Sequence, residues 1–314
     1  MDVRDPIVSV IVPVRDNPDG VAELLERLRA QTLPRERFEV VIGDDGSQED
    51  PLGSNEGDGW VRVTSGPRLN SYAARNRAVR QARGGVLAFC DSDCLPEPSW
   101  LEQGLAALAR ADLVAGEVAF VAPKAPTVWS LLTIDMFLDQ ERAVRRSRAV
   151  TANLFVRREL FEDLGGFADA LESGGDYDFA LRAVDREARL AYAPRAVVRH
   201  PTLDDARPFL RKVWVTNRWD AIRRALSGER PSAWVVLMVV PPIGIAVARR
   251  QSLRPVGKLY RPRLEAAGVS PTWRDNARAL PVLYFPVSLT AGCGRTLGWL
   301  EGLRLARRFR RAAR

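Results

Sequence analysis

The chain has 314 residues, of which 46% are hydrophobic and 27% charged, and its formal net charge is +8. This composition is typical of a protein with a globular core, and it excludes an intrinsically disordered chain. The positive charge comes almost entirely from arginine and favours anionic partners such as nucleoside diphosphates, phospholipid headgroups or nucleic acid.

The three cysteines are Cys90, Cys94 and Cys293, and their spacing matches neither a zinc site nor a disulfide framework. We expect buried free thiols in a reducing compartment. The first six residues are polar and acidic, so we expect no secretory signal before the first strand and a catalytic part that faces the cytosol.

The first hundred residues alternate between predicted strands and helices. Apolar, β-branched runs predict strands, and apolar residues on one face of a segment predict helices. The strands are expected at 7–14, 38–43, 60–64 and 86–90, and the helices at 19–31 and 71–82. Helices of ten to fifteen residues between strands indicate βαβ units and a parallel sheet.

The same patterns continue to about residue 226. Helices are predicted at 98–110, 128–142, 157–165, 176–182 and 208–226, and strands at 112–121, 150–156, 190–192 and 196–199. The last of these strands leads directly into His200, which is the only histidine in the chain.

Carboxylates recur at the ends of the predicted strands. Asp16 follows the first strand, Asp44 and Asp45 follow the second, and Asp91 and Asp93 follow the strand 86–90. Open α/β sheets bind ligands beyond the carboxyl ends of their strands, where an Asp-x-Asp sequence can hold a hard divalent cation and a sugar hydroxyl. A solvated turn explains one such pair equally well. Three clusters at one sheet edge favour a site for a polar ligand.

Several short motifs occur together in one order. They are Val10–Val14, Asp44-Asp45-Gly46-Ser47, Ala74-Arg75-Asn76, Asp91-Ser92-Asp93, Gly165-Gly166-Phe167, Asp176-Tyr177-Asp178-Phe179 and His200. Each is weak alone, but the ordered set, spread over residues 7–200, resembles family 2 glycosyltransferases. The resemblance implies a GT-A fold: a mostly parallel α/β sheet flanked by helices.

The resemblance also implies a reaction and a substrate site. A sugar would pass from a nucleotide-diphosphate donor to an acceptor hydroxyl, with inversion at the anomeric carbon. Pro13, Asp16 and Asp45 would contact the nucleotide base and ribose, with Asp44 close by, and Asp91 would hold ribose or metal. We assign Arg75, Asn76 and Asn153 to substrate binding as well.

The leaving group of this reaction is a diphosphate, and a divalent cation would neutralise its developing charge. By resemblance, Asp93 is the main protein ligand of Mn²⁺ or Mg²⁺. His200 could add a nitrogen ligand, which would favour Mn²⁺. A structural histidine is the alternative interpretation.

Inverting transfer needs one general base. Asp176 occupies the family's base position. Asp178 lies two residues further along, about 200° around a helix, so the two carboxylates cannot both face the sugar. We therefore assign Asp178 to a structural or acceptor-binding role. Both acids also suit the first turn of a helix for electrostatic reasons alone.

The sequence departs from the family at two positions. Gly175 stands where the family often has glutamate, which puts the acceptor contacts in doubt. Residues 215–219 (VTNRW) lack the glutamine of the Gln-x-x-Arg-Trp sequence of processive members, which favours transfer of a single sugar.

The last third of the chain is apolar and basic. Uncharged runs at 233–248 and 279–291 are interrupted by proline and shorter than the roughly 20 residues of a spanning helix, and the C-terminus is rich in arginine. This pattern favours re-entrant or interfacial association with an anionic membrane, at its cytoplasmic face. An arginine-rich end also suits nucleic acid, but the aromatic platforms and the folds that bind single strands are absent, so we expect no nucleic-acid partner.

We therefore predict a transferase domain at 1–228, with a nucleotide half to about 95 and an acceptor half from about 96, and a membrane-associated helical region at 229–314. The acceptor would be a lipid-linked or cell-envelope glycan. The alternatives are a nucleotidyltransferase and a catalytically silent nucleotide-sugar-binding protein. No glycine-rich phosphate loop follows the first strand, which disfavours the former.

Overall fold

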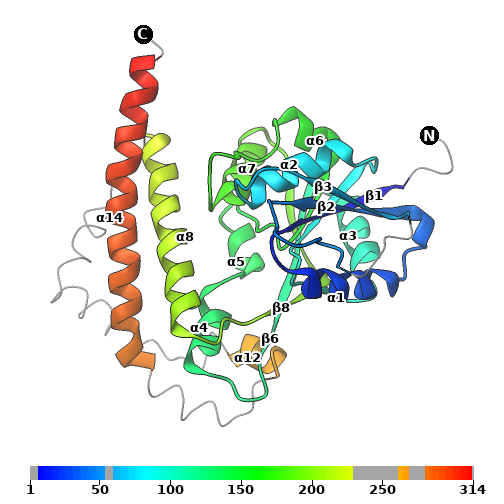
Figure 1. Cartoon of the computed structure of the whole chain (residues 1–314), viewed down its shortest axis with the longest axis horizontal. Coiled ribbons are helices and arrows are strands. Elements are labelled where there is room, and N and C mark those ends of the chain that lie inside the picture. Colours follow the sequence, from blue (N-terminus) through cyan, green and yellow to red (C-terminus); the bar gives the residue numbers. More distant parts are fainter. Residues whose placement is uncertain (1–5, 54–58, 229–260, 269–279, 313–314) are drawn as a thin grey trace. The chain divides into compact units, whose positions relative to one another are not determined.

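The computed structural model describes residues 6–53, 59–228, 261–268 and 280–312. The chain forms two compact units (Figure 1). Unit 1 comprises Met1–Ala119 and Leu138–Pro201, and unit 2 comprises Phe120–Phe137 and Thr202–Arg314. The predicted boundary near residue 228 adjoins residues outside the described part of the chain, and it stays a prediction.

Unit 1 is built on an eight-stranded sheet. The last residues of one of its strands, β6, belong to unit 2. The strands are β1 (Val8–Val14), β2 (Phe38–Asp44), β3 (Val61–Ser65), β4 (Val86–Cys90), β5 (Leu95–Pro96), β6 (Leu113–Val121), β7 (Asn153–Arg157) and β8 (Leu190–Pro201). The helices are α1 (Pro18–Arg29), α2 (Ser71–Gln81), α3 (Trp100–Leu108), α5 (Gln140–Val144), α6 (Arg158–Asp163) and α7 (Gly175–Asp185), with a 3₁₀ turn η1 (Arg35–Arg37).

The strand order is β3-β2-β1-β4-β7-β6-β8-β5. The first four strands of this order are parallel, whereas β7 runs antiparallel to both β4 and β6, and β5 runs antiparallel to β8. The sheet is therefore mixed, and the expectation of a mostly parallel sheet holds only for its nucleotide half. Apolar runs predict that a segment is a buried strand but carry no information about its direction.

The two faces of the sheet are covered by different helices, and the alternation of side chains along the strands decides which residues meet which helix. Val10 and Val12 of β1 pack with α1 and α3, whereas Ile11 between them packs with α2, α6 and α7. Figure 1 shows α1 and α3 on one side of the sheet and α2, α6 and α7 on the other. Burial on both faces explains why these strands are continuously apolar.

Two predicted elements differ in the structure. The helix predicted at 128–142 is divided into α4 (Val128–Met136) and α5, because the chain turns at Leu138, whose φ is +50°. The two short strands predicted at 190–192 and 196–199 form one strand, β8, which continues through His200.

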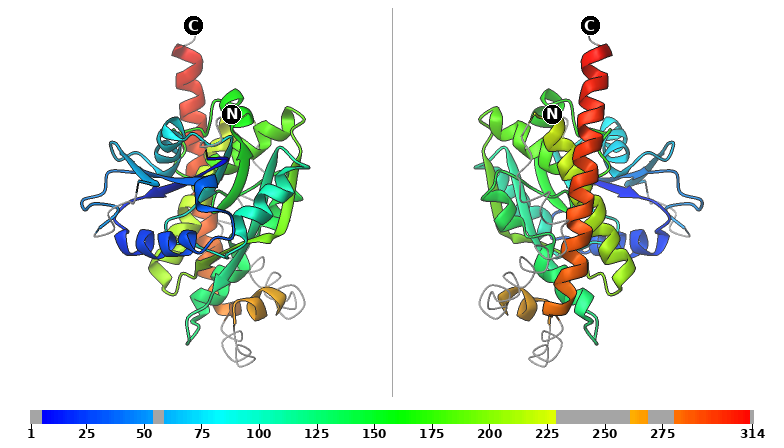
Figure 2. Two further views of the ribbon diagram at one scale, coloured as in Figure 1. Left: turned by 90° about the vertical axis from the view of Figure 1, so that its right-hand side faces the viewer. Right: turned by 90° about the vertical axis from the view of Figure 1, so that its left-hand side faces the viewer.

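Unit 2 contains α4, α8 (Ala206–Leu226), α12 (Arg261–Ala266) and α14 (Leu280–Ala312). Helix α14 packs against α8, lying beside it in Figure 1 and crossing it in both views of Figure 2. Their close approach depends on Gly298, because a Cβ atom there would lie 2.1 Å from the Arg218 carbonyl oxygen. Arg218 also donates to the Glu301 carboxylate at 2.6 Å. A small apolar core of Leu132, Phe209, Val213, Val287 and Ala291 joins α4, α8 and α14.

The apolar run at 233–248 lies outside the described residues. Within the described part of the chain, no helix combines the length and the hydropathy needed to cross a membrane.

Candidate active site

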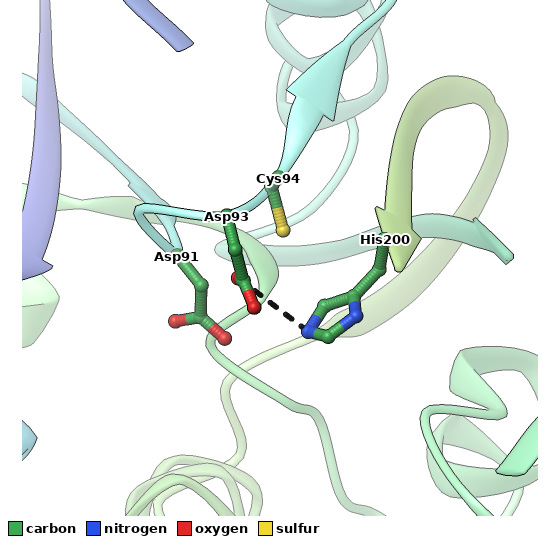
Figure 3. A group of neighbouring side chains, drawn as sticks. All are labelled: Asp91, Asp93, Cys94 and His200. Atoms are coloured by element: carbon green, nitrogen blue, oxygen red, sulfur yellow. Dashed lines mark ion pairs between the residues drawn. The ribbon is translucent and has the colours of Figure 1, made fainter. Parts of the chain in front are cut away.

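The Asp-x-Asp sequence forms the turn between β4 and β5. The Cys94 N–H donates to the Asp91 carbonyl oxygen at 3.1 Å, which closes the turn. Strand β5 then pairs with β8, with Leu95 opposite Arg199. This pairing brings His200, more than a hundred residues away in sequence, next to Asp93 (Figure 3).

Four side chains form a group that could hold a metal ion: Asp91, Asp93, Cys94 and His200. Each offers one ligand atom, and these four atoms lie within 4.8 Å of one another. His200 Nδ1 lies 2.7 Å from the Pro201 carbonyl oxygen, which only accepts hydrogen bonds, so this nitrogen carries the proton. Nε2, the other ring nitrogen, lies 3.6 Å from Asp93 Oδ1. Neighbouring ligands of one octahedral ion lie roughly 3 Å apart, so a small shift would accommodate a divalent cation.

Cys94 is a poor ligand for a hard cation. Its hydrogen bond with Cys90, together with burial, holds the pKa of the Cys94 thiol well above its usual value. The sulfur also lies 3.7 Å from the Ala152 carbonyl oxygen. The groups that fit a divalent cation are therefore the two carboxylates and the imidazole.

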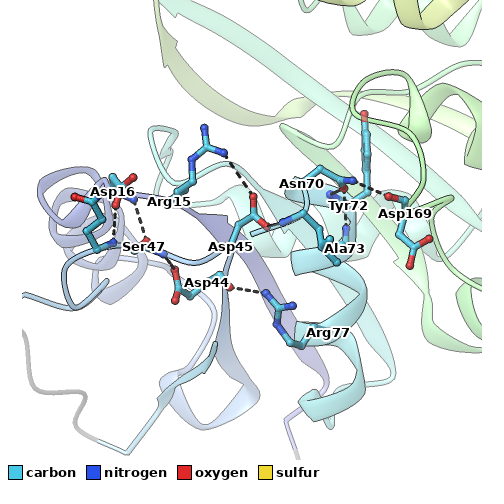
Figure 4. Close-up of polar contacts among 12 residues, drawn as sticks. Arg15, Asp16, Asp44, Asp45, Ser47, Asn70, Tyr72, Ala73, Arg77 and Asp169 are labelled. Carbon is cyan, nitrogen blue, oxygen red and sulfur yellow. Dashed lines mark hydrogen bonds and ion pairs between the residues drawn. The ribbon is translucent and has the colours of Figure 1, made fainter. Parts of the chain in front are cut away.

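The acids that follow β1 and β2 hold two loops together (Figure 4). Asp16 Oδ1 accepts from the Gln48 N–H at 2.8 Å, and the Asp16 N–H donates to Ser47 Oγ at 2.9 Å. The Ser47 N–H in turn donates to Asp44 Oδ1 at 2.9 Å. Asp16 itself lies in the left-handed region, with φ +50°.

Asp45 is buried beside these loops. One of its oxygens accepts from the Leu69 N–H at 2.8 Å, and the other lies 3.8 Å from a guanidinium nitrogen of Arg15. Pro13 is paired with Gly43 in the register of β1 and β2, one residue before Asp44. The four residues predicted to meet the nucleotide therefore lie at the carboxyl ends of two adjacent parallel strands.

Helix α2 provides polar side chains that tie the nucleotide half to the rest of the site. Asn70 caps the helix, because its side-chain oxygen accepts from the N–H groups of Tyr72 and Ala73. Asn76 exchanges two hydrogen bonds with the backbone of Phe167 and so fixes the Gly165-Gly166-Phe167 turn. Both polar atoms of the Asn76 side-chain amide are therefore hydrogen-bonded to the protein backbone.

Arg75 is the central cation of this region. Its side chain is only 3% exposed, and its guanidinium pairs with the Asp91 carboxylate. The same charge lowers the pKa of Asp176. Arg75 Nε has no hydrogen-bond partner among the described residues. A buried cation thus lies between the proposed metal acids and the proposed base.

Asp176 lies in the first turn of α7 and is buried. Its Oδ1 accepts from the Tyr72 hydroxyl at 3.0 Å and from the Tyr177 N–H at 2.9 Å, and its Oδ2 accepts from the Thr151 N–H at 3.3 Å. Burial raises the pKa of Asp176 above its usual value, although these hydrogen bonds and Arg75 lower it. A carboxylate with a raised pKa can hold a proton more readily, as a general base requires.

Asp178 has a different environment. It accepts from Arg182 Nε at 2.8 Å, one helical turn further along α7. The same guanidinium donates to the carbonyl oxygens of Leu164 and Gly166. These contacts favour the structural alternative for Asp178, because they connect α7 to the turn that precedes it.

Asn153 was predicted to contact substrate, but the structure places it in the core, with no exposed surface. Its Oδ1 accepts from Trp100 Nε1 at 2.9 Å, and its Nδ2 donates to the carbonyl oxygens of Glu117 and Ala196, both at 2.8 Å. The assignment is corrected accordingly: Asn153 connects α3, β6 and β8 beneath the site. A polar residue in an apolar strand sequence does not reveal whether it faces a ligand or the core.

Sequence reasoning missed two partners of Asp176, Tyr72 and Thr151, and the donor Arg77. An Arg77 guanidinium nitrogen donates to the Asp44 carbonyl oxygen at 2.5 Å. Tyr72 adjoins the quoted Ala74-Arg75-Asn76 motif, and its position on the apolar face of α2 was available from helical spacing. The contact with residue 176 depends on tertiary structure.

The model of the family described as glycosyl transferase family 2 matches residues 9–165, half of the chain. AglE, a glycosyltransferase of Haloferax volcanii, is 36% identical over 214 residues, which span 65% of this chain and 68% of AglE. The chain belongs to family 2 of the glycosyltransferases. It is an enzyme of this class, which sets aside the nucleotidyltransferase and silent alternatives.

Another relative of this glycosyltransferase covers more of the chain. The pre-mycofactocin glycosyltransferase of Mycobacterium tuberculosis is 30% identical over 274 residues, 78% of this chain. The match spans only 55% of that relative.

Two solved structures share the fold, as the GT-A expectation required. The mannosyltransferase PcManGT of Pyrobaculum calidifontis superposes with a TM-score of 0.58 at 19% identity, over 94% of this chain and 88% of that one. Residues 1–349 of TarS from S. aureus superpose with a TM-score of 0.51 at 20% identity, over 98% and 92%.

Proposed function

We propose that this glycosyltransferase is a metal-dependent inverting enzyme that moves a sugar from a nucleotide diphosphate to an acceptor hydroxyl. The observation that carries the proposal is the position of Arg75, which pairs with Asp91 of the metal-capable cluster and lowers the pKa of Asp176. One buried cation therefore adjoins both the acids for the donor diphosphate and the acid for the acceptor proton.

The cation and donor have support in the comparisons. PcManGT was solved in complex with GDP-Man and Mn²⁺, and TarS in complex with UDP-GlcNAc. In this chain Asp91, Asp93 and His200 would hold Mn²⁺ or Mg²⁺, which supplies charge neutralisation to the leaving diphosphate. Asp16, Asp44 and Asp45 would position the nucleoside.

The protein's own part in the reaction is to remove one proton. The acceptor oxygen forms a bond to the anomeric carbon while the bond from that carbon to the diphosphate oxygen breaks, and the bonding electrons leave with the nucleoside diphosphate. Asp176 Oδ2 would take the proton of the acceptor hydroxyl, because Oδ1 already accepts two hydrogen bonds. One displacement of this kind inverts the anomeric carbon.

This reaction is tested by incubating the purified full-length chain with a panel of nucleotide sugars and measuring released nucleoside diphosphate. We expect release that depends on Mn²⁺ or Mg²⁺ and stops on chelation. Asp93→Asn should abolish it, whereas Glu26→Gln, which alters an exposed acid of α1, should not. Full turnover in excess chelator would show that the assigned metal cluster has no role in the reaction.

We further propose that the enzyme works at the cytoplasmic face of a membrane, on a lipid-linked or cell-envelope glycan acceptor. The support is in α14, where Leu289, Leu297, Leu300 and Leu303 are exposed. At 100° per residue these leucines share one side of the helix, opposite Gly294, Gly298 and Gly302, which approach α8. Arg304, exposed at one end of the leucine face, would favour an anionic surface.

Membrane association is tested by sedimentation with anionic vesicles. Full-length protein should pellet with the vesicles, and high salt should weaken this without abolishing it. Leu297→Gln with Leu300→Gln should reduce binding, whereas Val121→Gln, at another exposed apolar position, should not. Truncation at 228 is a poorer test, because it would uncover the apolar side of α8. Protein that ignores vesicles would refute the membrane proposal.

A further inference from the structure

Tyr72 is buried in the first turn of α2, and its hydroxyl donates to Asp176 Oδ1 at 3.0 Å. Its ring packs against Phe167, with centroids 5.6 Å apart, and the Arg75 guanidinium carbon lies 5.6 Å from the ring centroid. The ring is thus fixed on two sides, so that the position of its hydroxyl is determined by packing.

Gly175, the residue before Asp176, makes room for this ring. A Cβ atom at residue 175 would lie 2.9 Å from Tyr72 Cδ2 and 3.0 Å from Cε2. Such contacts are shorter than carbon atoms tolerate, so a side chain at this position would displace the ring. Tyr72 and Gly175 therefore form one fitted pair, in which the glycine lets the hydroxyl reach the carboxylate.

The two oxygens of Asp176 are used unequally. Oδ1 accepts from the Tyr72 hydroxyl and from the Tyr177 N–H, whereas among the described residues Oδ2 accepts only a longer hydrogen bond, from the Thr151 N–H. Oδ2 is therefore the oxygen with a lone pair left to receive a proton. The tyrosine hydroxyl determines which of the two oxygens this is.

We propose that Tyr72 is a positioning residue for the base, holding the Asp176 carboxylate ionised and turned so that Oδ2 meets the acceptor hydroxyl. The inference rests on the proposed function, in which Asp176 is the base. It adds a residue that touches neither donor nor acceptor and acts through the carboxylate alone.

The groups that face Asp176 come from three segments. Helix α2 contributes Tyr72 and the charge of Arg75, the segment before β7 contributes the Thr151 N–H, and α7 contributes the Tyr177 N–H. All of them lower the pKa of Asp176, but burial has the larger effect and raises it. Burial and the Asp176 charge raise the pKa of Tyr72 well above its usual value, so the hydroxyl stays a donor at every assay pH.

The test is the pH profile of kcat/KM, measured by nucleoside diphosphate release, for Tyr72→Phe. This variant keeps the ring and removes only the hydroxyl. Without that donor the Asp176 carboxylate is protonated more easily, so the acidic limb should move to higher pH. The rate should fall about tenfold on that limb, and the difference should narrow as pH rises.

Tyr192→Phe is the matched control, because the Tyr192 hydroxyl donates to Glu117 Oε2 at 2.5 Å and has no contact with Asp176. It should leave the profile unchanged. An unshifted limb in Tyr72→Phe, in a protein that melts at the wild-type temperature, would overturn the proposal.

Two further variants separate this inference from the proposed function. If Asp176→Asn keeps full activity, the base assignment itself fails. If Asp176→Asn is inactive but Tyr72→Phe has a wild-type profile, only the role of Tyr72 is refuted. The fitted pair has its own readout: Gly175→Ala should lower the melting temperature in the wild-type background and much less in Tyr72→Ala. Equal losses in the two backgrounds would contradict the pairing.

Discussion

Replacing Asp176 by asparagine keeps the shape of the side chain and removes its ability to take a proton. Loss of a general base reduces the rate by about 10²–10⁴-fold. We expect a fall of this size in kcat for transfer, with little change in donor affinity, because the nucleotide acids Asp16, Asp44 and Asp45 lie at the ends of β1 and β2, whereas Asp176 lies in α7. Released nucleoside diphosphate at saturating donor measures it.

The effect on stability follows from the hydrogen bonds of the carboxylate. An asparagine oxygen can replace Oδ1 and still accept from Tyr72 and Tyr177, but its NH₂ group would then face the Thr151 N–H. Two opposed buried donors cost about 1–3 kcal/mol. Removing a buried charge offsets this cost, so the variant should remain folded near neutral pH.

The pH dependence of this difference has a definite sign. Burial raises the pKa of Asp176 in the folded state, so the folded protein binds the proton more tightly than the unfolded chain. The resulting stability is complete below the ordinary carboxyl pKa and is lost as pH rises through the raised value, at about 1.4 kcal/mol for each pH unit that separates the folded and unfolded pKa. Asparagine does not titrate, so the variant should gain relative to wild type over that window.

Denaturant unfolding of both proteins from acidic to neutral pH measures this gain, and the difference between them isolates residue 176 from the other titrating groups. A wild-type rate in the variant would refute the base assignment. A difference in unfolding free energy that is independent of pH would refute the account of the raised pKa.

Three other substitutions test other parts of the structure. His200→Gln should weaken Mn²⁺ binding in a direct titration by about tenfold or more, because Nε2 lies 3.6 Å from Asp93 Oδ1, whereas unchanged affinity would assign His200 a structural role. Asn153→Ala removes the acceptor of Trp100 Nε1 and one donor to each of two carbonyl groups, so it should cost about 3–5 kcal/mol in unfolding free energy. A loss below about 1 kcal/mol would contradict the role of Asn153 in the core. Gly298→Ala should lower the free energy of unfolding by about 1–3 kcal/mol through its clash with the Arg218 carbonyl, whereas Leu297→Ala on the exposed side should not.

Local sequence patterns were enough to locate the strands of the nucleotide half and the acids at their ends. Ile11 lies in a run that is apolar because both faces of its strand are covered, and such runs identify buried strands without knowledge of their neighbours. Asp91 and Asp93 were identifiable because a buried strand does not end in two carboxylates for reasons of packing. The order of the motifs then indicated the family.

Tertiary structure decided the partners of these residues. The pairing of β5 with β8 placed His200 beside Asp93, and packing of α2 against α7 placed the Tyr72 hydroxyl on Asp176. It also decided that Asn153 faces the core rather than a substrate. Local sequence determines which residues form a strand or helix, because that depends on neighbours a few positions away. Which side chains meet depends on strand direction and helix docking, and these are determined by contacts among residues as far apart as Tyr72 and Asp176.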